Sequence, residues 1–248
     1  MPENKVGPMK HFGIGRRVAK TVLMLGCVSA MGVGSLCAQV YTDTLADLTN
    51  PSGAYNSLVI GDKTFSHFAY QATDLTSFDP TQIQVSASID ADGVYYLTWS
   101  GSVALATLST AVADLKLDYA VMATGGIIDM IDQSYTGSAQ PAGSTFLAVD
   151  ETASIGTFGG QVVGQSHLTA YDVTDPPAEA NDQLNIVPPQ TVLYVTKDIG
   201  LAAISPPGAF ITISRVTQSF HQVPEPGTLL LGSLCGGLLL FARSRRSS

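Results

Sequence analysis

Carboxylates are the side chains of this sequence with the most evident potential for chemistry. Asp90 and Asp92 stand on either side of Ala91 and directly ahead of Gly93. Hard cations such as calcium bind several carboxylate oxygens presented by a tight turn, so this segment could begin a calcium loop. A complete loop also needs a third ligand and a distal Glu, and neither follows here. A plain hairpin turn is therefore the favoured interpretation, and we expect no metal or other cofactor.

A second group of acids, Asp129, Asp132, Asp150 and Glu151, could converge in the fold. Near neighbours of this kind are expected by chance in so acidic a chain, so we expect them on solvated faces. Paired carboxylates can also hydrolyse glycosidic bonds, but no pair is singled out by its context. A carbohydrate-active enzyme with an unrecognised carboxylate pair and a calcium-stabilised adhesion module both remain open as alternatives.

The histidines offer no recognisable catalytic or metal-binding pattern. His67, His167 and His221 occur singly, without a partner at the spacing of metal ligands. The sequence also contains no nucleophile elbow, phosphate-binding glycine loop or dinucleotide fingerprint. We therefore predict no catalytic residue, and interpret His67 and His167 as strand residues and His221 as exposed.

Aromatic residues gather in two short stretches, at Phe68 and Tyr70 and at Tyr95, Tyr96 and Trp99. Aromatic faces stack on sugar rings, so the five could form a carbohydrate platform. Aromatic side chains also provide the largest buried areas in a protein core. We predict that most of them belong to the core.

The elements that would position these residues are predicted to be strands. Residues 82–89 alternate between apolar side chains and polar or small ones, which is typical of a half-buried strand. The turn residues 90–93 follow, because Asp-Gly suits a positive φ, and residues 94–100 resume the strand. A second hairpin is predicted from residues 56–60 and 64–72 around Gly61-Asp62.

Further strands are predicted at residues 115–121, 146–155, 165–173, 191–199 and 210–220, separated by stretches such as Gly159-Gly160, Pro188-Pro189 and Pro206-Pro207-Gly208. Residues 104–113 could be strand or a short helix. Many short strands at this spacing predict an all-β fold, an antiparallel sandwich or jelly roll in a single domain.

The N-terminus has the order of a secretory signal. Five basic residues precede an apolar run at 21–38, and small residues close it. This pattern predicts a helical signal peptide at residues 1–38, with cleavage after Cys37 or Ala38. Export would pass through a translocase, by either the general or the twin-arginine route.

The C-terminus carries three features in a fixed order. A short motif (Val223, Pro224, Glu225, Pro226) precedes an apolar segment at residues 227–242 and a basic end at 243–248 containing Arg243, Arg245 and Arg246. A 16-residue helix is only about 24 Å long, whereas the hydrocarbon core of a bilayer is about 30 Å thick. The segment is therefore too short for a comfortable permanent span, which predicts a transient hydrophobic helix in the membrane.

This arrangement at residues 223–248 resembles the PEP-CTERM sorting tail of exported bacterial proteins. The resemblance implies recognition and cleavage by an exosortase-type membrane enzyme in a bacterium that makes exopolysaccharide. The same tail is also known as the ice-binding protein C-terminal domain, a label that implies no ice binding by this chain.

Between the two signals lies a predicted β-rich extracytoplasmic domain at residues 39–222. It contains 18 of the chain's 20 acidic residues but only four of its 12 basic ones, a net charge of −14. So acidic a surface repels phosphate backbones, which argues against a nucleic-acid partner. We expect a non-enzymatic structural or polysaccharide-associated protein of the cell surface or extracellular matrix, with transient membrane insertion during its inner-membrane transit.

Overall fold

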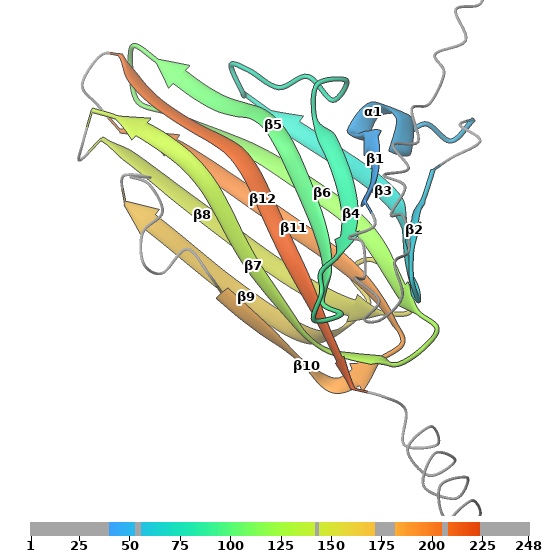
Figure 1. The fold of residues 1–248 in the computed structure, drawn as a ribbon. Coiled ribbons are helices and arrows are strands. Elements are labelled where there is room, and N and C mark those ends of the chain that lie inside the picture. The colour runs from blue at the N-terminus through green and yellow to red at the C-terminus, as the bar shows by residue number, and fades with distance from the viewer. Residues whose placement is uncertain (1–39, 53–55, 142–143, 172–181, 205–207, 224–248) are drawn as a thin grey trace, which may run out of the picture. The chain divides into compact units, whose positions relative to one another are not determined.

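A computed structural model of the chain describes residues 40–52, 56–141, 144–171, 182–204 and 208–223. All described residues belong to one compact unit. They form strands and one short helix, coloured along the chain in Figure 1. The elements are β1 (Val40–Thr44), α1 (Leu45–Leu48), β2 (Leu58–Ile60), β3 (Lys63–Thr73), β4 (Gln84–Ile89), β5 (Tyr95–Thr107), β6 (Ala111–Ala123), β7 (Ile127–Gln140), β8 (Thr145–Ile155), β9 (Gln161–Tyr171), β10 (Asp182–Gln190), β11 (Val192–Ala203) and β12 (Ala209–Val223).

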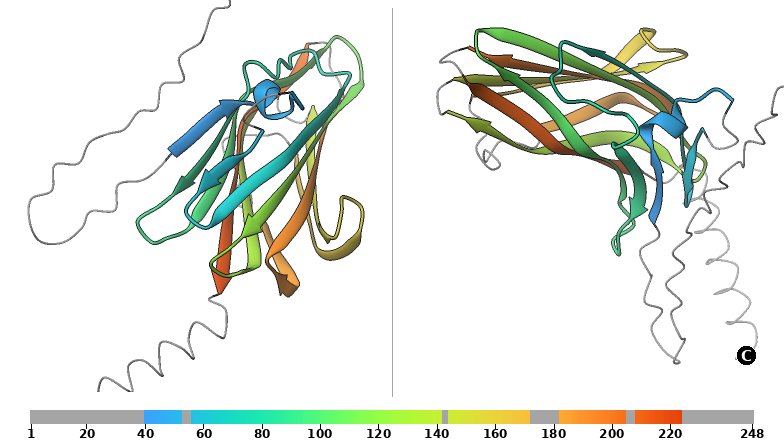
Figure 2. Two further views of the ribbon diagram at one scale, coloured as in Figure 1. Left: turned by 90° about the vertical axis from the view of Figure 1, so that its right-hand side faces the viewer. Right: turned by 90° about the horizontal axis from the view of Figure 1, so that it is seen from above.

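The strands form two six-stranded antiparallel sheets, so the predicted all-β sandwich is confirmed. Sheet A has the order β1-β4-β5-β12-β7-β10, and sheet B has the order β2-β3-β6-β11-β8-β9. The two layers are visible from two directions in Figure 2. From β5 onward the chain changes sheet at most connections, and only β8 and β9 are sequential neighbours within one sheet. Both sheets therefore draw their strands from the whole length of the domain.

Both predicted hairpins are present. Strands β4 and β5 pair antiparallel from Gln84 opposite Ser100 to Ile89 opposite Tyr95, and their turn contains Gly93 at a φ of 81°. Strands β2 and β3 pair around Gly61, which has a φ of 53°. These conformations favour glycine, because a side chain there would approach the following backbone too closely.

The interior between the sheets contains an aromatic cluster centred on Tyr119 of β6. Its ring centroid lies 5.4 Å from that of Trp99 on β5, 6.3 Å from that of Phe220 on β12, and 6.4 Å from that of Phe65 on β3. Phe65 and Phe220 also contact each other across the sandwich, with centroids 5.1 Å apart. The cluster therefore joins sheet A to sheet B through tilted ring packing.

A buried polar cluster lies in the same interior and consists of Gln133, Glu151, Lys197 and Gln218. Lys197 and Glu151 come from neighbouring strands of sheet B, and Gln133 and Gln218 come from sheet A. The lysine and the glutamate have no exposed side-chain area, and their Nζ and Oε2 atoms are 2.7 Å apart. The expectation of a solvated Glu151 is therefore wrong, because its carboxylate is bonded inside the sandwich.

Three other sequence-based expectations need correction or completion. Residues 104–113 contain no helix: their first part ends β5 and their last part begins β6. Pro188-Pro189 does not separate strands but lies inside β10. It is tolerated because β10 is the edge strand of sheet A and its register shifts between Asn185 and Gln190. Strands β1, β7 and β10 were not expected.

The aromatic cluster gives a test of the core. Phe65 is fully buried, so Phe65→Ala leaves a cavity and should lower the free energy of unfolding by about 3–5 kcal/mol. Leu108→Ala is the matched control, since Leu108 is 81% exposed and its loss should change stability by less than about 0.5 kcal/mol. Urea unfolding followed by the fluorescence of the single tryptophan measures both. Equal midpoints for the two variants would contradict the proposed core.

Candidate functional site

The outer face of sheet A contains an open concave surface. This hollow, of about 560 Å³, crosses β1, β4, β5 and β12. Most of its lining residues carry a hydroxyl or a charge: Val40, Ser86, Ser88, Ile89, Asp90, Tyr96, Thr98, Ser100, Arg215 and Thr217. We refer to this surface as the sheet A hollow.

Strand alternation places these side chains outward. In β5, Tyr95, Leu97 and Trp99 are buried while Tyr96 and Thr98 between them are half-buried on the other face. The same alternation in β4 buries Val85 and Ala87. Because successive side chains of a strand point to opposite faces, the core positions determine which residues line the hollow.

A row of hydroxyls crosses three strands at the centre of the hollow. Ser86 is opposite Thr98, and Thr98 is opposite Thr217. The Thr98 Oγ1 donates to Thr217 Oγ1 at 3.4 Å. Neighbouring strands lie about 4.8 Å apart, and each hydroxyl can both donate and accept. The row therefore offers regularly spaced hydrogen-bonding groups to a polyhydroxylated ligand.

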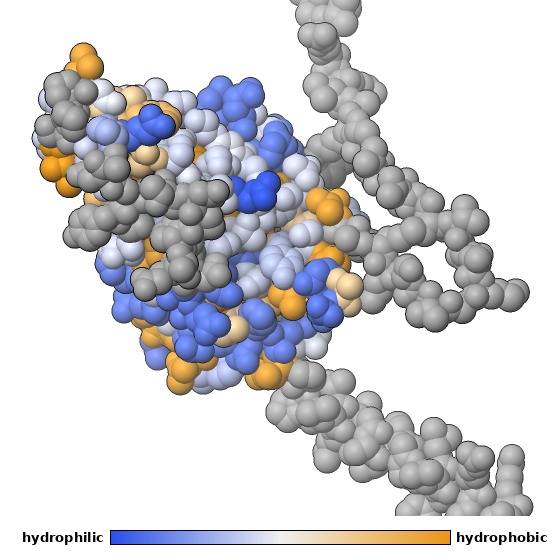
Figure 3. All heavy atoms as spheres, turned by 60° about the vertical axis from the view of Figure 1, so that its left-hand side comes forward, coloured by the Kyte–Doolittle hydropathy of each residue, from blue (hydrophilic) through white to orange (hydrophobic). Residues whose placement is uncertain are grey.

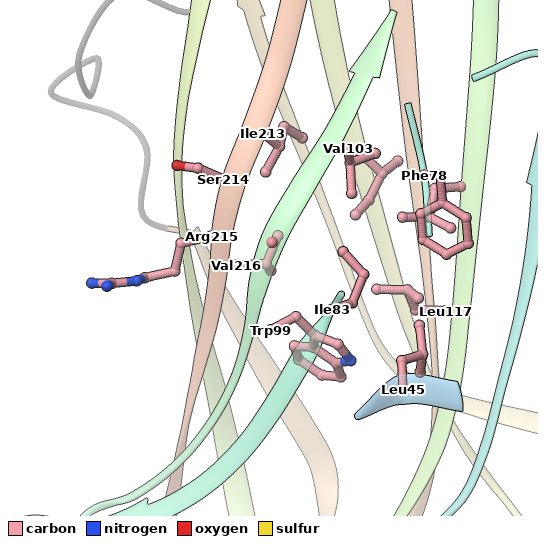
Figure 4. Close-up of a pocket in the computed structure, with 13 residues that line it drawn as sticks. Leu45, Phe78, Ile83, Trp99, Val103, Leu117, Ile213, Ser214, Arg215 and Val216 are labelled. Carbon is pink, nitrogen blue, oxygen red and sulfur yellow. The ribbon is translucent and has the colours of Figure 1, made fainter. Parts of the chain in front are cut away.

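A bulge in β12 brings Arg215 to this face. The pairing of β12 with both of its neighbours shifts between Ile213 and Arg215, and Ser214 and Arg215 are consecutive exposed residues. Figure 4 shows the guanidinium directed away from the apolar side chains of the interior. Arg215 is the only arginine between residues 39 and 222. The hollow therefore contains one cation that can donate several hydrogen bonds.

The interior void drawn in Figure 4 is a different feature. It is lined largely by apolar residues, including Ile83, Trp99 and Leu117, and has a volume of about 20 Å³. A single water needs about 10–15 Å³ measured in this way. The void is too small for a sugar or a cofactor and is part of the core packing.

Asp90, the first of the two weak metal candidates, holds the β4–β5 turn. Its Oδ1 accepts the backbone N–H groups of Val94 at 2.9 Å and Asp92 at 3.0 Å, and its Oδ2 accepts the Tyr96 hydroxyl at 2.9 Å. These hydrogen bonds, that of Val94 first, lower the pKa of Asp90. Both oxygens of Asp90 are thus used within the turn, and Asp92 is exposed. Across the described ranges, no three His, Cys, Asp or Glu residues are grouped as metal ligands.

The remaining acids do not form one cluster. Asp150 contacts His167 on the exposed surface of sheet B, whereas Glu151 belongs to the buried polar cluster. A carboxyl pair does occur on sheet B, where Asp114 of β6 shares a hydrogen bond with Asp198 of β11. Burial, followed by this hydrogen bond and the charge of Asp198, raises the pKa of Asp114 to about 6.

The aromatic residues divide between core and surface. Phe68, Tyr95 and Trp99 are buried, as predicted for most of the five. Tyr96 lines the sheet A hollow. Tyr70 is exposed and packs against Phe78, with ring centroids 5.3 Å apart. The structure therefore does not bring the five together as a platform.

The three histidines lie in strands and are far apart in the topology. His67 is in a bulge of β3 with a φ of 56°, and its Nδ1 is 2.9 Å from Ser66 Oγ. His167 lies in β9, and His221 lies in β12, where it is half-buried. His67 and His167 are thus strand residues as predicted, while the prediction of an exposed His221 is only partly met.

Most residues of the two predicted signals lie outside the described residues. This applies to Cys37, Ala38, Pro224, Glu225, Pro226, Arg243, Arg245 and Arg246. Val223 is described and is the last residue of β12, opposite Ile127. The domain boundary expected between residues 222 and 223 therefore falls one residue before the strand ends. No helix in the described part of the chain is long and apolar enough to cross a membrane.

The surface shown in Figure 3 is mainly hydrophilic, with apolar residues in separate small patches.

Comparison with protein families identifies the C-terminal segment. A family model of the PEP-CTERM protein-sorting motif matches residues 222–246. The chain therefore carries this sorting motif, which supports export to the cell surface or extracellular space and implies processing by an exosortase, a membrane enzyme. The match begins at Gln222, which is still part of β12.

Comparison with the curated proteins found no match. Among solved structures, the chain resembles the carbohydrate-binding module TmCBM61 in complex with β-1,4-galactotriose (11% identity, 64% of this chain, 90% of that chain, TM-score 0.30). It also resembles the arabinose-bound arabinofuranosidase MgGH51 (12% identity, 61% of this chain, 23% of that chain, TM-score 0.24). A third resemblance is to infectious bursal disease virus, Gx strain (10% identity, 89% of this chain, 54% of that chain, TM-score 0.17). Likenesses this low transfer neither ligand nor activity to this chain.

The Asp114–Asp198 pair predicts a pH dependence of stability. An unfolded Asp has a pKa of about 3.9, below the value of about 6 for folded Asp114. Between these values the folded state binds more protons than the unfolded state, so this pair makes stability fall as the pH rises from 4 to 6. Asp114→Asn should remove this part of the decrease, measured as unfolding free energy against pH.

The control is Asp92→Asn, which removes a carboxylate from an exposed turn residue. Its pH profile should keep the slope of the unaltered protein. Parallel profiles for the Asp114 variant and the unaltered protein would show that the carboxyl pair is not coupled to folding.

Proposed function

We propose that this chain, which ends in a PEP-CTERM sorting motif, is an exported, non-enzymatic protein of the cell surface or extracellular matrix that contacts polysaccharide through the sheet A hollow. The observation that carries the proposal is the combination of that motif with an outward face of regularly spaced hydroxyls and one arginine.

The proposed route uses both ends of the chain. The signal peptide at residues 1–38 engages an export translocase, and the apolar segment at 227–242 then holds the chain transiently in the inner membrane. The arginines of the basic end favour the cytoplasmic side, so the Pro-Glu-Pro sequence is presented outside to the exosortase. Cleavage releases the domain to the surface or the matrix.

The end of β12 suits this route. Val223 is paired with β7, and the two prolines that follow it cannot donate backbone hydrogen bonds to extend a strand. Strand β12 therefore ends at Val223, the first residue of the four-residue motif. An enzyme acting on the motif need not unfold the sandwich.

Weak binding of a polysaccharide fits the chemistry of the hollow. Hydroxyl side chains can exchange hydrogen bonds with sugar hydroxyls, and the Arg215 guanidinium can donate to sugar oxygens or to an acidic group. Because the hollow is open and shallow, single-site affinity is low. Repetition of sugars along a polymer and of protein copies on a surface would raise the avidity.

The carboxyl pair of sheet B supports an enzyme less well. Glycosidases place their two carboxyl groups at least about 5 Å apart, so that a sugar or a water fits between them. Asp114 and Asp198 share a hydrogen bond and do not line the sheet A hollow. The geometry of Asp114 and Asp198 fits two neighbouring carboxyl groups that share one proton on the surface of sheet B.

Sorting can be tested by removing residues 224–248, which leaves β12 intact. We expect the truncated protein to be exported and folded but absent from the surface fraction, because the exosortase has no substrate. A second variant, Pro224→Ala with Pro226→Ala, keeps the length and charge of the tail and should accumulate uncleaved in the membrane fraction. Fractionation with mass spectrometry of both chain ends measures this. Unchanged surface delivery of the truncated protein would contradict the proposed route.

Polysaccharide contact can be tested with a charge-matched pair of variants. Arg215→Ala should weaken retention of the protein on exopolysaccharide from the producing cells by about ten- to a hundredfold, since a charged hydrogen bond contributes about 1.5–3 kcal/mol. Lys116→Ala removes the same charge from sheet B and should have little effect. Affinity electrophoresis in gels containing the polysaccharide compares them. Equal weakening by both variants would indicate net-charge attraction without a specific site.

A further inference from the structure

Two of the three lysines of the sandwich are in an unusual environment. Lys63 and Lys197 have no exposed side-chain area, whereas lysine is almost never fully buried unless it is paired. Each donates to the side-chain amide oxygen of a glutamine and to a carboxylate. In both cases the lysine belongs to sheet B and the glutamine to sheet A. The third lysine, Lys116, is exposed.

The Lys197 site is fully enclosed by the sandwich. Lys197 Nζ contacts Gln133 Oε1 and lies 2.7 Å from Glu151 Oε2. The other oxygen of Glu151 accepts from Gln218 Nε2, and Gln133 Nε2 donates to Ser166 Oγ at 3.1 Å. The amine, the amide group and the carboxylate are thus held together without free rotation.

The Lys63 site repeats this arrangement near the end of β12. Lys63 Nζ contacts Gln222 Oε1 and lies 2.7 Å from Asp62 Oδ1. The ring of Tyr95 covers the amine at 4.2 Å from the ring centroid. Asp62 is held in turn by the backbone N–H of Gly125 at 3.1 Å.

We propose that these two sites are self-catalysed crosslinks, in which Lys197 forms an isopeptide bond with Gln133 and Lys63 forms one with Gln222. The bonds would join β11 to β7 and β3 to β12, so each ties one sheet covalently to the other. This inference is independent of the proposed polysaccharide contact.

The reaction is an exchange of one amine for another at the glutamine Cδ. The lysine ammonium first passes a proton to the neighbouring carboxylate, which leaves a neutral amine and a carboxylic acid. The Nζ lone pair then forms a bond to Cδ, and the carbonyl electron pair moves to Oε1. The carboxyl group carries a proton from Nζ to Nε2, the Cδ–Nε2 bond breaks, and ammonia leaves. The products are a secondary amide, ammonia and a neutral carboxylic acid, with no oxidant or cofactor.

The interior supplies the conditions that this reaction needs. Fixed proximity replaces a bimolecular encounter by an intramolecular one, which accelerates such an attack. At the enclosed Lys197 site, exclusion of water also protects the amide from hydrolysis. Burial is also the main cause that lowers the pKa of Lys63, which favours the neutral, nucleophilic amine.

The products are also better suited to the interior than the reactants. A buried ion pair loses much of its attraction to the cost of desolvating both charges. Crosslinking replaces the pair by a neutral amide and a neutral acid. The covalent link at Gln222 would hold the last strand at the residue where the sorting motif begins.

The full chain as recovered from cells allows a direct test. Denaturing digestion after Glu cuts at Glu151 and Glu179, which places Lys63 and Gln133 in the fragment ending at Glu151. Lys197 and Gln222 then lie in the fragment beginning at Ala180. We expect the two fragments to remain joined and to be lighter than their sum by two ammonia molecules. Separate fragments at full mass would overturn the proposal and leave two buried hydrogen-bonded lysines.

Four variants assign each bond. Gln133→Leu removes the electrophile of the Lys197 site but keeps the Lys197–Glu151 pair. Gln222→Leu removes the electrophile of the Lys63 site. Each single variant should restore the mass of one ammonia, while the two fragments stay joined through the remaining bond. The double variant should release the fragments. Glu151→Gln keeps both reactants of the first site but removes its proton carrier, and should also prevent one loss. Because this variant lacks the cut at residue 151, its first fragment ends at Glu179. An unchanged mass deficit in either single glutamine variant would overturn the bond assigned to that residue.

Discussion

The buried polar cluster is the constraint on which the arrangement of the two sheets depends. Lys197 and Glu151 lie where no water can solvate them, so their remaining hydrogen-bonding groups must be met by side chains. Those side chains, Gln133 and Gln218, come from the opposite sheet. Any slip of one sheet over the other would keep this ion pair but deprive it of its hydrogen bonds to the two glutamines, whereas the apolar contacts of the same core could be replaced by others. The polar groups thus specify one alignment.

The outer faces of the sheets carry the polar side chains that can contact other molecules. Because the inward positions are occupied by the core and the polar cluster, the hydroxyl row and Arg215 belong to the positions in between. The bulge in β12 adds to this, since it directs Arg215 outward after Ile213 has pointed inward. The acidic, hydroxyl-rich exterior and the C-terminal sorting motif are consistent with export to the cell surface or extracellular space.

Two of the strands that sequence patterns missed, β7 and β10, have different physical causes. Strand β7 has Gln133 at an inward position and a register shift near its start, so its apolar residues do not repeat with a period of two. Strand β10 contains two prolines, which normally indicate the end of a strand. They are tolerated because β10 is an edge strand, so the backbone on one of its sides has no neighbouring strand to which it must donate hydrogen bonds. The hairpins at Gly61 and Gly93 were predictable because glycine and aspartate act locally in a turn.

The sequence by itself determined the all-β class, the two tight hairpins and the sorting motif, because each depends on residues close together in the chain. It indicated Asp90 as a turn residue and most of the aromatic residues as core. Only the tertiary structure decided that Gln133 contacts Lys197, that Glu151 is buried, and that Ser86, Thr98 and Thr217 form one row. These residues are far apart in sequence, and their contacts follow from strand order and register, which no local pattern encodes.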